Sequence, residues 1–136
     1  QLDERIVRFE SSLLDWIRDE SDSAALVNIE RILTHLSAMD RREPFRKLWW
    51  LGSGLAEAAR YELVTDTDMT KKLFARLIRE LRAQRRRDDG ARRRAPSPDL
   101  FHDILDLLNR VDDSTSGPIM RHVVREFSLR IDLPTN

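Results

Sequence analysis

The chain has 136 residues, a length that fits one domain able to bury a core without disulfides or a bound metal. Hydrophobic residues make up 40% and charged residues 35%, glycine and proline are few and the net charge is zero, a composition that favours a helical globular domain over a sheet protein or a disordered chain. Cysteine is absent, so a disulfide framework and a cysteine-ligated zinc or iron–sulfur site are excluded.

The start of the chain indicates neither secretion nor membrane insertion. It begins at Gln1 rather than Met, has no basic start followed by an apolar run, and contains no apolar stretch long enough to span a bilayer. We therefore expect a domain excised from a longer cytoplasmic protein, with no membrane insertion.

Two amphipathic helices are predicted in the first 40 residues. In the first, over about residues 2–17, apolar side chains recur at alternating steps of four and three, which places them on one face. The polar run at 19–23 breaks this pattern, and Ser21, Asp22 or Ser23 can cap a second helix by accepting a backbone N–H. The apolar stripe of the second helix consists of Leu26, Ile29, Leu33 and Leu36.

A third helix is predicted over about residues 45–61, because Pro44 disfavours helix at the residue before it and suits the first turn of a new one. Its Gly52 and Gly54 lie inside the helical pattern, without the preceding strand and the third glycine of a phosphate-binding loop, so we do not expect a nucleotide site. The small residues instead predict a surface that another helix can approach closely. They are Gly52, Ser53, Gly54, Ala56, Ala58 and Ala59.

The adjacent tryptophans of the third helix leave two alternatives. Trp49 and Trp50 lie about 100° apart around a helix, so one can enter the core while the other lies nearer its edge. We favour core packing of both. A tryptophan left partly exposed would instead anchor a protein partner, with Arg46 and Lys47 contacting that partner at the rim.

A fourth helix is predicted after residues 64–68, with Asp66 or Thr67 as its cap and a basic C-terminal end that suits the helix dipole. Its apolar stripe consists of Met69, Leu73, Leu77 and Leu81. The following segment, about residues 85–97, has no apolar periodicity and contains Gly90, so a mobile arginine-rich connection is predicted there.

The arginines of this connection are a candidate anion-binding segment. Residues 82–94 hold seven arginines against two aspartates, which could neutralise nucleic-acid phosphates or anionic lipid. Two runs supply six of the seven: Arg85, Arg86 and Arg87, then Arg92, Arg93 and Arg94. We favour a solvated linker and do not expect nucleic acid as a partner, because aromatic residues for base stacking are missing and arginine outnumbers lysine 21 to 3 in the whole chain.

Two further helices are predicted after the connection. Ser97 followed by Pro98 starts a fifth helix, which ends near Asp112, and apolar spacing over 119–127 indicates a short sixth. No segment shows sustained period-two alternation. The predicted fold is therefore all-α, a single domain over 1–136 built as a bundle of five to six mostly antiparallel amphipathic helices.

The three histidines, His35, His102 and His122, lie on different predicted helices without a partner at metal-ligand spacing, so we expect no metal site and no cofactor. His35 has a second interpretation, because histidine-phosphotransfer domains present their phosphoacceptor midway along a helix. Such domains follow the histidine with a lysine and a glycine, whereas Leu36 to Met39 follow here. The sequence has no nucleophile–base pattern, so we predict that the chain is not an enzyme. Phosphotransfer through His35 stays as the alternative.

Two stretches resemble a known family over about residues 44–130. They read "PFRKLWWLGSGLAEAARYELVTDTDMTKKLFARLIRELRAQ" and "PDLFHDILDLLNRVDDSTSGPIMRHVVREFSL". This resembles the non-catalytic, histidine-phosphotransfer-like helical module near the N-terminus of the hybrid CheA-like kinases of type IV pilus systems (PilL and ChpA type), and the related stand-alone protein FimL. The resemblance implies a helical scaffold that docks protein partners in a chemosensory complex controlling type IV pili and twitching motility, in the cytoplasm and at a cell pole.

Overall fold

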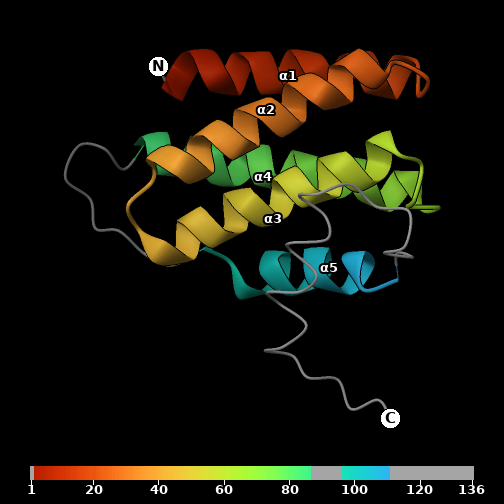
Figure 1. The fold of residues 1–136 in the computed structure, drawn as a ribbon. Coiled ribbons are helices and arrows are strands. Elements are labelled where there is room, and N and C mark those ends of the chain that lie inside the picture. Colours follow the sequence, from red (N-terminus) through yellow and green to blue (C-terminus); the bar gives the residue numbers. More distant parts are fainter. Residues whose placement is uncertain (1, 87–95, 111–136) are drawn as a thin grey trace, which may run out of the picture.

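The computed structural model describes residues 2–86 and 96–110, and in these ranges the protein is a small all-helical bundle (Figure 1). Its helices are α1 (Leu2–Arg18), α2 (Ser23–Met39), α3 (Glu43–Arg60), α4 (Thr67–Arg86) and α5 (Pro98–Leu108). The predicted all-α fold and its first five helices are confirmed. The predicted sixth helix at 119–127 lies outside the described residues.

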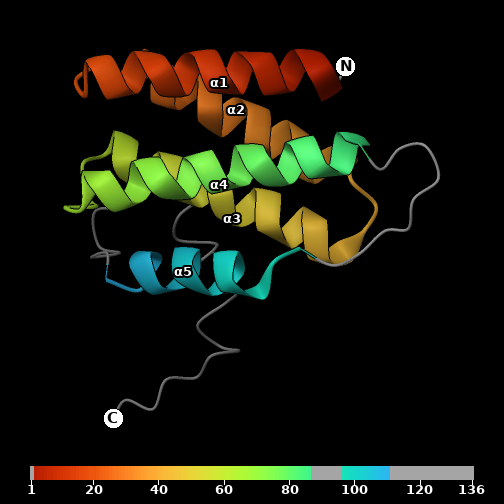
Figure 2. The ribbon, with the colours of Figure 1, turned by 180° about the vertical axis from the view of Figure 1, so that it is seen from behind.

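The helices are stacked from one edge of the bundle to the other. In Figures 1 and 2, α1 lies at one edge and α5 at the opposite edge, with α2, α3 and α4 between them. α3 packs against α2, α4 and α5, whereas α1 packs against α2 and α4. Consecutive helices run in opposite directions, as the short connections predict.

Side-chain caps fix the starts of three helices. The Asp22 carboxylate accepts the backbone N–H of Ala25 at 3.1 Å and begins α2. In the same way, the Ser97 hydroxyl accepts the N–H of Leu100 at 3.4 Å and begins α5, whose first residue is Pro98. Asp66 accepts the N–H of Met69 at 3.0 Å before α4. Each of the three is among the caps that the sequence predicts, because Asp and Ser satisfy N–H groups that a helix start leaves open.

The predicted connection at 85–97 begins too early, because Arg85 and Arg86 belong to the last turn of α4. Arginine is a good helix former and its charge suits a helix C-terminus, so the helix continues beyond the last apolar residue. The Arg85 guanidinium also contacts the Asp3 carboxylate of α1 at 3.1 Å. A second ion pair, Glu10–Arg82, links the antiparallel helices α1 and α4, and Glu20–Lys71 links the α1–α2 turn to α4.

The small residues of α3 allow the close helix approach that the sequence predicts. A methyl group placed on Gly52 would lie 2.9 Å from a Leu77 methyl carbon of α4 and 3.0 Å from a Leu33 methyl carbon of α2. Glycine therefore lets α2 and α4 approach one point of α3 from two sides. Every residue from Leu51 to Ala59 is buried, which makes α3 the central helix.

The remaining stripes form one core around α3, with one difference from the predicted pattern. Leu73, Leu77 and Leu81 of α4 are buried, but Met69 at the start of that helix is 38% exposed. No helix in the ranges that the structure describes has the length and apolar character needed to cross a membrane.

Candidate docking site

The first two turns of α3 bring together three of the predicted partner-binding residues. Glu43, Arg46, Lys47 and Trp50 are spaced so that they share one face of the helix. Glu43 accepts a hydrogen bond from Arg46 at 2.7 Å and lies 3.7 Å from the Lys47 ammonium group. Trp50 is partly buried against the core. We call these four residues the α3 patch.

The charged side chains of the α3 patch keep much of their surface. The side chains of Arg46 and Lys47 are 47% and 29% exposed, and that of Glu43 is 55% exposed. The patch therefore combines a partly buried indole with two cations that one carboxylate holds in place. Of these residue types, Trp and Arg are the ones enriched at protein interfaces.

Trp49 points the other way. Its side chain is 1% exposed, and its indole N–H donates a hydrogen bond of 3.0 Å to the Asp40 carboxylate. Its ring packs near that of Phe45, with centroids 6.1 Å apart. Trp49 is a core residue that offers no surface to a partner, so of the two tryptophans only Trp50 fits the predicted anchor.

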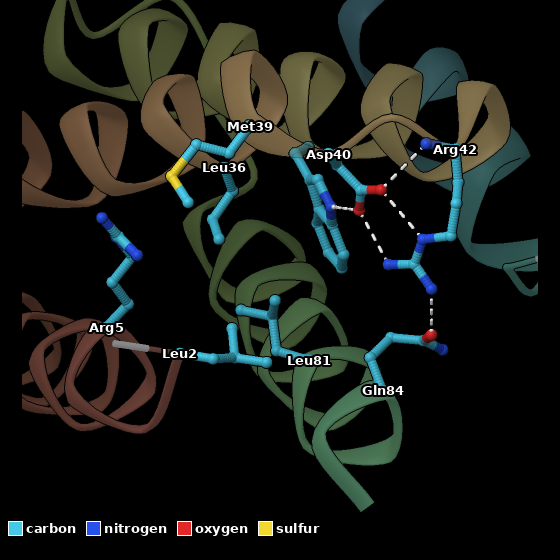
Figure 3. A pocket seen from close by; sticks show the side chains of 9 residues that line it. Leu2, Arg5, Leu36, Met39, Asp40, Arg42, Leu81 and Gln84 are labelled. Carbon is cyan, nitrogen blue, oxygen red and sulfur yellow. Dashed lines mark hydrogen bonds and ion pairs between the residues drawn. The ribbon is translucent and has the colours of Figure 1, made fainter. Parts of the chain in front are cut away.

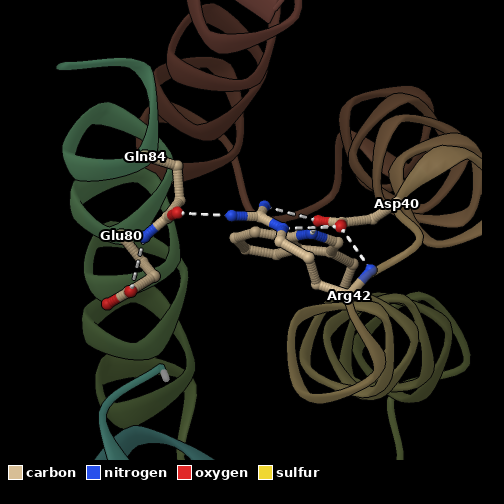
Figure 4. A network of polar contacts seen from close by, with 5 residues as sticks. Asp40, Arg42, Glu80 and Gln84 are labelled. Atoms are coloured by element: carbon tan, nitrogen blue, oxygen red, sulfur yellow. Dashed lines mark hydrogen bonds and ion pairs between the residues drawn. The ribbon is translucent and has the colours of Figure 1, made fainter. Parts of the chain in front are cut away.

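Asp40 is the centre of a polar network that joins the α2–α3 turn to α4 (Figure 4). Its carboxylate accepts hydrogen bonds from the Arg42 side chain at 2.8 Å, from the Arg42 backbone N–H at 3.0 Å and from Trp49. Arg42 also donates to the Gln84 carbonyl oxygen at 2.7 Å, and the Gln84 amide donates to Glu80 at 3.4 Å. The turn and the last part of α4 are thus held at a fixed separation.

The network also sets the charge of Asp40. Burial raises the pKa of the Asp40 carboxyl, but hydrogen bonds from the Arg42 side chain, the Trp49 indole and the Arg42 backbone N–H lower it more, so the pKa lies below its usual range. The group stays ionised at neutral pH and its oxygens face fixed donors. This arrangement suits a structural clamp and does not suit a general acid or base.

A hollow of about 240 Å³ adjoins this network at the end of the bundle (Figure 3). Its lining is mainly apolar, with charged groups at the edge. It consists of Leu2, Arg5, Leu36, Met39, Asp40, Arg42, Trp49, Leu81 and Gln84. Such a space can accept an apolar side chain, because its walls come from four helices and the α2–α3 turn.

No local pattern in the sequence predicts this network. Asp40 precedes "RREP" in a segment that ends one helix and begins another. Its position suggests a role in capping a helix, but does not indicate which side chains contact its carboxylate. Gln84 is 42 residues from Arg42, and no local spacing pairs them. A buried indole always needs an acceptor for its N–H, and this is the one signal that points to Asp40.

His35 is exposed on α2 beside a shallow hollow of about 520 Å³. This hollow is also lined by Glu30 and Arg60, which form an ion pair with a shortest distance of 2.8 Å. His102 is exposed on α5, and His122 lies outside the described residues. Within residues 2–86 and 96–110, no group of His, Asp or Glu side chains could hold a metal ion.

The structure describes little of the candidate anion-binding runs. Arg85 is exposed at the end of α4, where it pairs with Asp3, and the backbone of Arg86 completes that helix. The other residues of the two runs, Arg87, Arg92, Arg93 and Arg94, lie outside the described residues. Arg85 therefore contributes to the α1–α4 contact in the described part of the chain.

The comparison with known families agrees with the resemblance to FimL seen in the sequence. Residues 5–136 match the family described as "FimL scaffold protein second domain". No curated protein and no solved structure matches the chain. Because the match covers nearly all of its 136 residues, the chain belongs to the family of FimL scaffold protein second domains.

Proposed function

We propose that this scaffold domain is a non-enzymatic docking module that binds protein partners of a chemosensory complex controlling type IV pili and twitching motility. The domain acts in the cytoplasm, at a cell pole, and its docking site is the α3 patch. The observation that carries the site is the shared face of Trp50, Arg46 and Lys47 in the first two turns of a helix that is buried from Leu51 to Ala59.

The composition of the α3 patch specifies the chemistry of the partner surface. The exposed part of Trp50 buries a large area with little loss of rotamer freedom, so it supplies most of the binding energy. Arg46 and Lys47 lie one turn away and attract carboxylates. The partner surface is therefore an apolar depression bordered by Asp or Glu side chains.

A pull-down from a piliated bacterial lysate tests the site. The wild-type chain and Arg46→Glu/Lys47→Glu are used as baits, with and without nuclease, and bound proteins are quantified by mass spectrometry. Reversing two cations at the rim should lower the recovery of type IV pilus chemosensory proteins about tenfold. Recovery by the wild-type chain should survive nuclease.

A matched control separates the α3 patch from general electrostatics. Lys72→Glu/Arg79→Glu makes the same charge change on two exposed residues of α4 and should leave recovery unchanged. Circular dichroism checks that both variants are folded. Equal losses with the two variants, or retention by Arg46→Glu/Lys47→Glu, would assign docking to another surface, and loss on nuclease treatment would favour nucleic acid.

The non-enzymatic part of the proposal has its own test, because His35 is exposed on α2. Wild type and His35→Ala are incubated with a phosphorylated receiver domain, and acid-labile phosphate is measured. We expect none on either chain, because the residues that follow the phosphoacceptor of active phosphotransfer domains are missing after His35. Acid-labile phosphate on wild type alone would replace the docking proposal with phosphotransfer.

A further inference from the structure

The outer face of α1 carries apolar side chains that the bundle does not use. α1 lies at the edge of the molecule in both views and packs against α2 and α4 with one side (Figures 1 and 2). Its core face is formed by Ile6, Phe9, Leu13 and Trp16. On the other side, Val7 and Leu14 are 63% and 51% exposed, more than any other large apolar residue of α1.

The spacing of this outer face is that of a helix–helix seam. Its residues are separated by steps of three, four, three and four, the pattern of the contact positions in a coiled coil. They are Glu4, Val7, Ser11, Leu14 and Arg18. The centre of the seam is occupied by the small side chain of Ser11, and a shallow hollow of about 500 Å³ lies beside it, between Val7 and Ser11.

The charges at the two ends of this seam are complementary to a second copy of the same helix. When two copies of α1 lie antiparallel with Ser11 on the two-fold axis, Glu4 of each faces Arg18 of the other. The same register places Val7 against Leu14, so the apolar residues meet between the charged ends. A parallel pair would instead place like charges together at both ends.

Both terminal charges of the seam are available for such a contact. Glu4 and Arg18 are exposed, and the structure records no ion pair for either within residues 2–86 and 96–110. The other acidic side chains along α1 that face α4, Asp3 and Glu10, are already paired with Arg85 and Arg82. The acidic side chains on the face directed at α4 thus have ion-pair partners within the bundle, whereas Glu4 and Arg18 on the opposite face have none among the described residues.

We infer that the outer face of α1 is a self-association surface on which a second copy of this chain packs with its α1 antiparallel. The contact is isologous, because the same five positions serve both copies. A seam of one helix per copy is smaller than a standard protein interface, so the dimer is a weak one that forms at raised concentration. This surface lies on α1 and is separate from the α3 patch.

Analytical ultracentrifugation of charge-swap variants tests the register. Glu4→Arg and Arg18→Glu each place like charges at both ends of the seam, and each should weaken self-association at least about tenfold. An equimolar mixture of the two variants restores opposite charges at both ends and should recover the heterodimer. The double variant Glu4→Arg/Arg18→Glu should dimerise like the wild type.

Two further variants test whether self-association depends on this surface. Leu14→Glu should abolish association, whereas Met69→Glu introduces the same charge at an exposed apolar residue of α4 and should not change it. Circular dichroism establishes that each variant is folded. A wild-type chain that remains monomeric up to about 1 mM, or single charge variants that fail to recombine on mixing, would overturn the proposal.

Discussion

The helices α3 and α1 differ in how much of their surface the bundle uses. Every α3 residue from Leu51 to Ala59 is buried, whereas α1 buries one face and leaves Val7 63% and Leu14 51% exposed. The amino acids from Leu51 to Ala59 of α3 are therefore constrained by packing on all sides, and the packing of this bundle does not constrain those on the outer face of α1. Substitutions from Leu51 to Ala59 should change folding, and substitutions on the outer face of α1 should change association.

The largest effect on the free energy of unfolding is expected at Trp49, close to the fully buried part of α3. Trp49→Ala removes a buried side chain and one donor of Asp40, so the free energy of unfolding should fall by about 4 kcal/mol. Trp50→Ala removes a side chain that is only partly buried and should cost about 1 to 2 kcal/mol. Urea denaturation measures both, and equal losses would contradict the different placement of the two indoles.

The contact of α3 with its two neighbours can be broken at Gly52. Gly52→Val places methyl groups against Leu33 and Leu77, and overpacking should cost about 2 to 3 kcal/mol. Adding Leu77→Ala vacates space at this point, so the double variant should lose at least about 1 kcal/mol less than the sum of the single losses.

An exposed helical position is the control for Gly52. Ala75→Val on the outer side of α4 should cost about 0.5 kcal/mol, because only helix propensity changes there. A cost as small as this at Gly52 would show that Leu33 and Leu77 move aside easily.

The polar clamp at the start of α3 should give a pH-dependent effect of intermediate size. Asp40→Asn removes the charge that Arg42 and Trp49 stabilise and should cost about 1 to 2 kcal/mol at pH 7. Because the folded protein holds the pKa of Asp40 below its usual value, the unfolded chain takes up the proton first as pH falls. The stabilisation is complete above about pH 4 and is lost as pH falls through the folded pKa.

Thermal unfolding of wild type and Asp40→Asn between neutral and acidic pH measures this dependence. The difference between their melting temperatures should narrow as pH decreases below the ordinary range for an Asp carboxyl. A difference that stays constant or widens on acidification would mean that the carboxylate charge does not stabilise the clamp.

The smallest effect on folding is expected on the outer face of α1. Leu14→Ser should change the free energy of unfolding by less than about 0.5 kcal/mol in dilute solution, because the side chain is 51% exposed. The adjacent Leu13 is 6% exposed, and Leu13→Ser should cost about 3 kcal/mol. Similar losses at the two positions, measured by urea denaturation, would remove the distinction between the faces of α1.

The sequence predicts the helices well because each has a local signal. Asp22, Ser97 and Asp66 begin helices where a capping side chain precedes an apolar stripe, and the structure has the same caps. The connection is predicted to begin at about Arg85, but the helix continues to Arg86, because good helix formers follow the end of the apolar stripe and extend the helix beyond it. Helix ends without a glycine or proline have no comparable signal.

The site is less predictable, because it depends on which side each residue of α3 faces. The sequence places Trp49 and Trp50 at different angles but does not say which enters the core, since both are apolar and adjacent. Their choice follows from Asp40, which accepts the Trp49 N–H across a turn of the chain. The role of Gly52 is easier to predict. A glycine in a helix interior lowers the stability of the helix, so its presence there indicates that another helix packs closely against it.

The hydrogen-bonded indoles also give the molecule optical reporters at two separate places. Trp16 donates its N–H to the backbone carbonyl of Glu20 at 3.2 Å, at the turn between α1 and α2, and Trp49 donates to Asp40 at the turn between α2 and α3. The two fluorophores therefore lie at opposite ends of α2. In two variants that each keep one of these tryptophans, with Phe at the other position and at 50, single-tryptophan emission would show whether both turns open in one cooperative step or one end frays before the other.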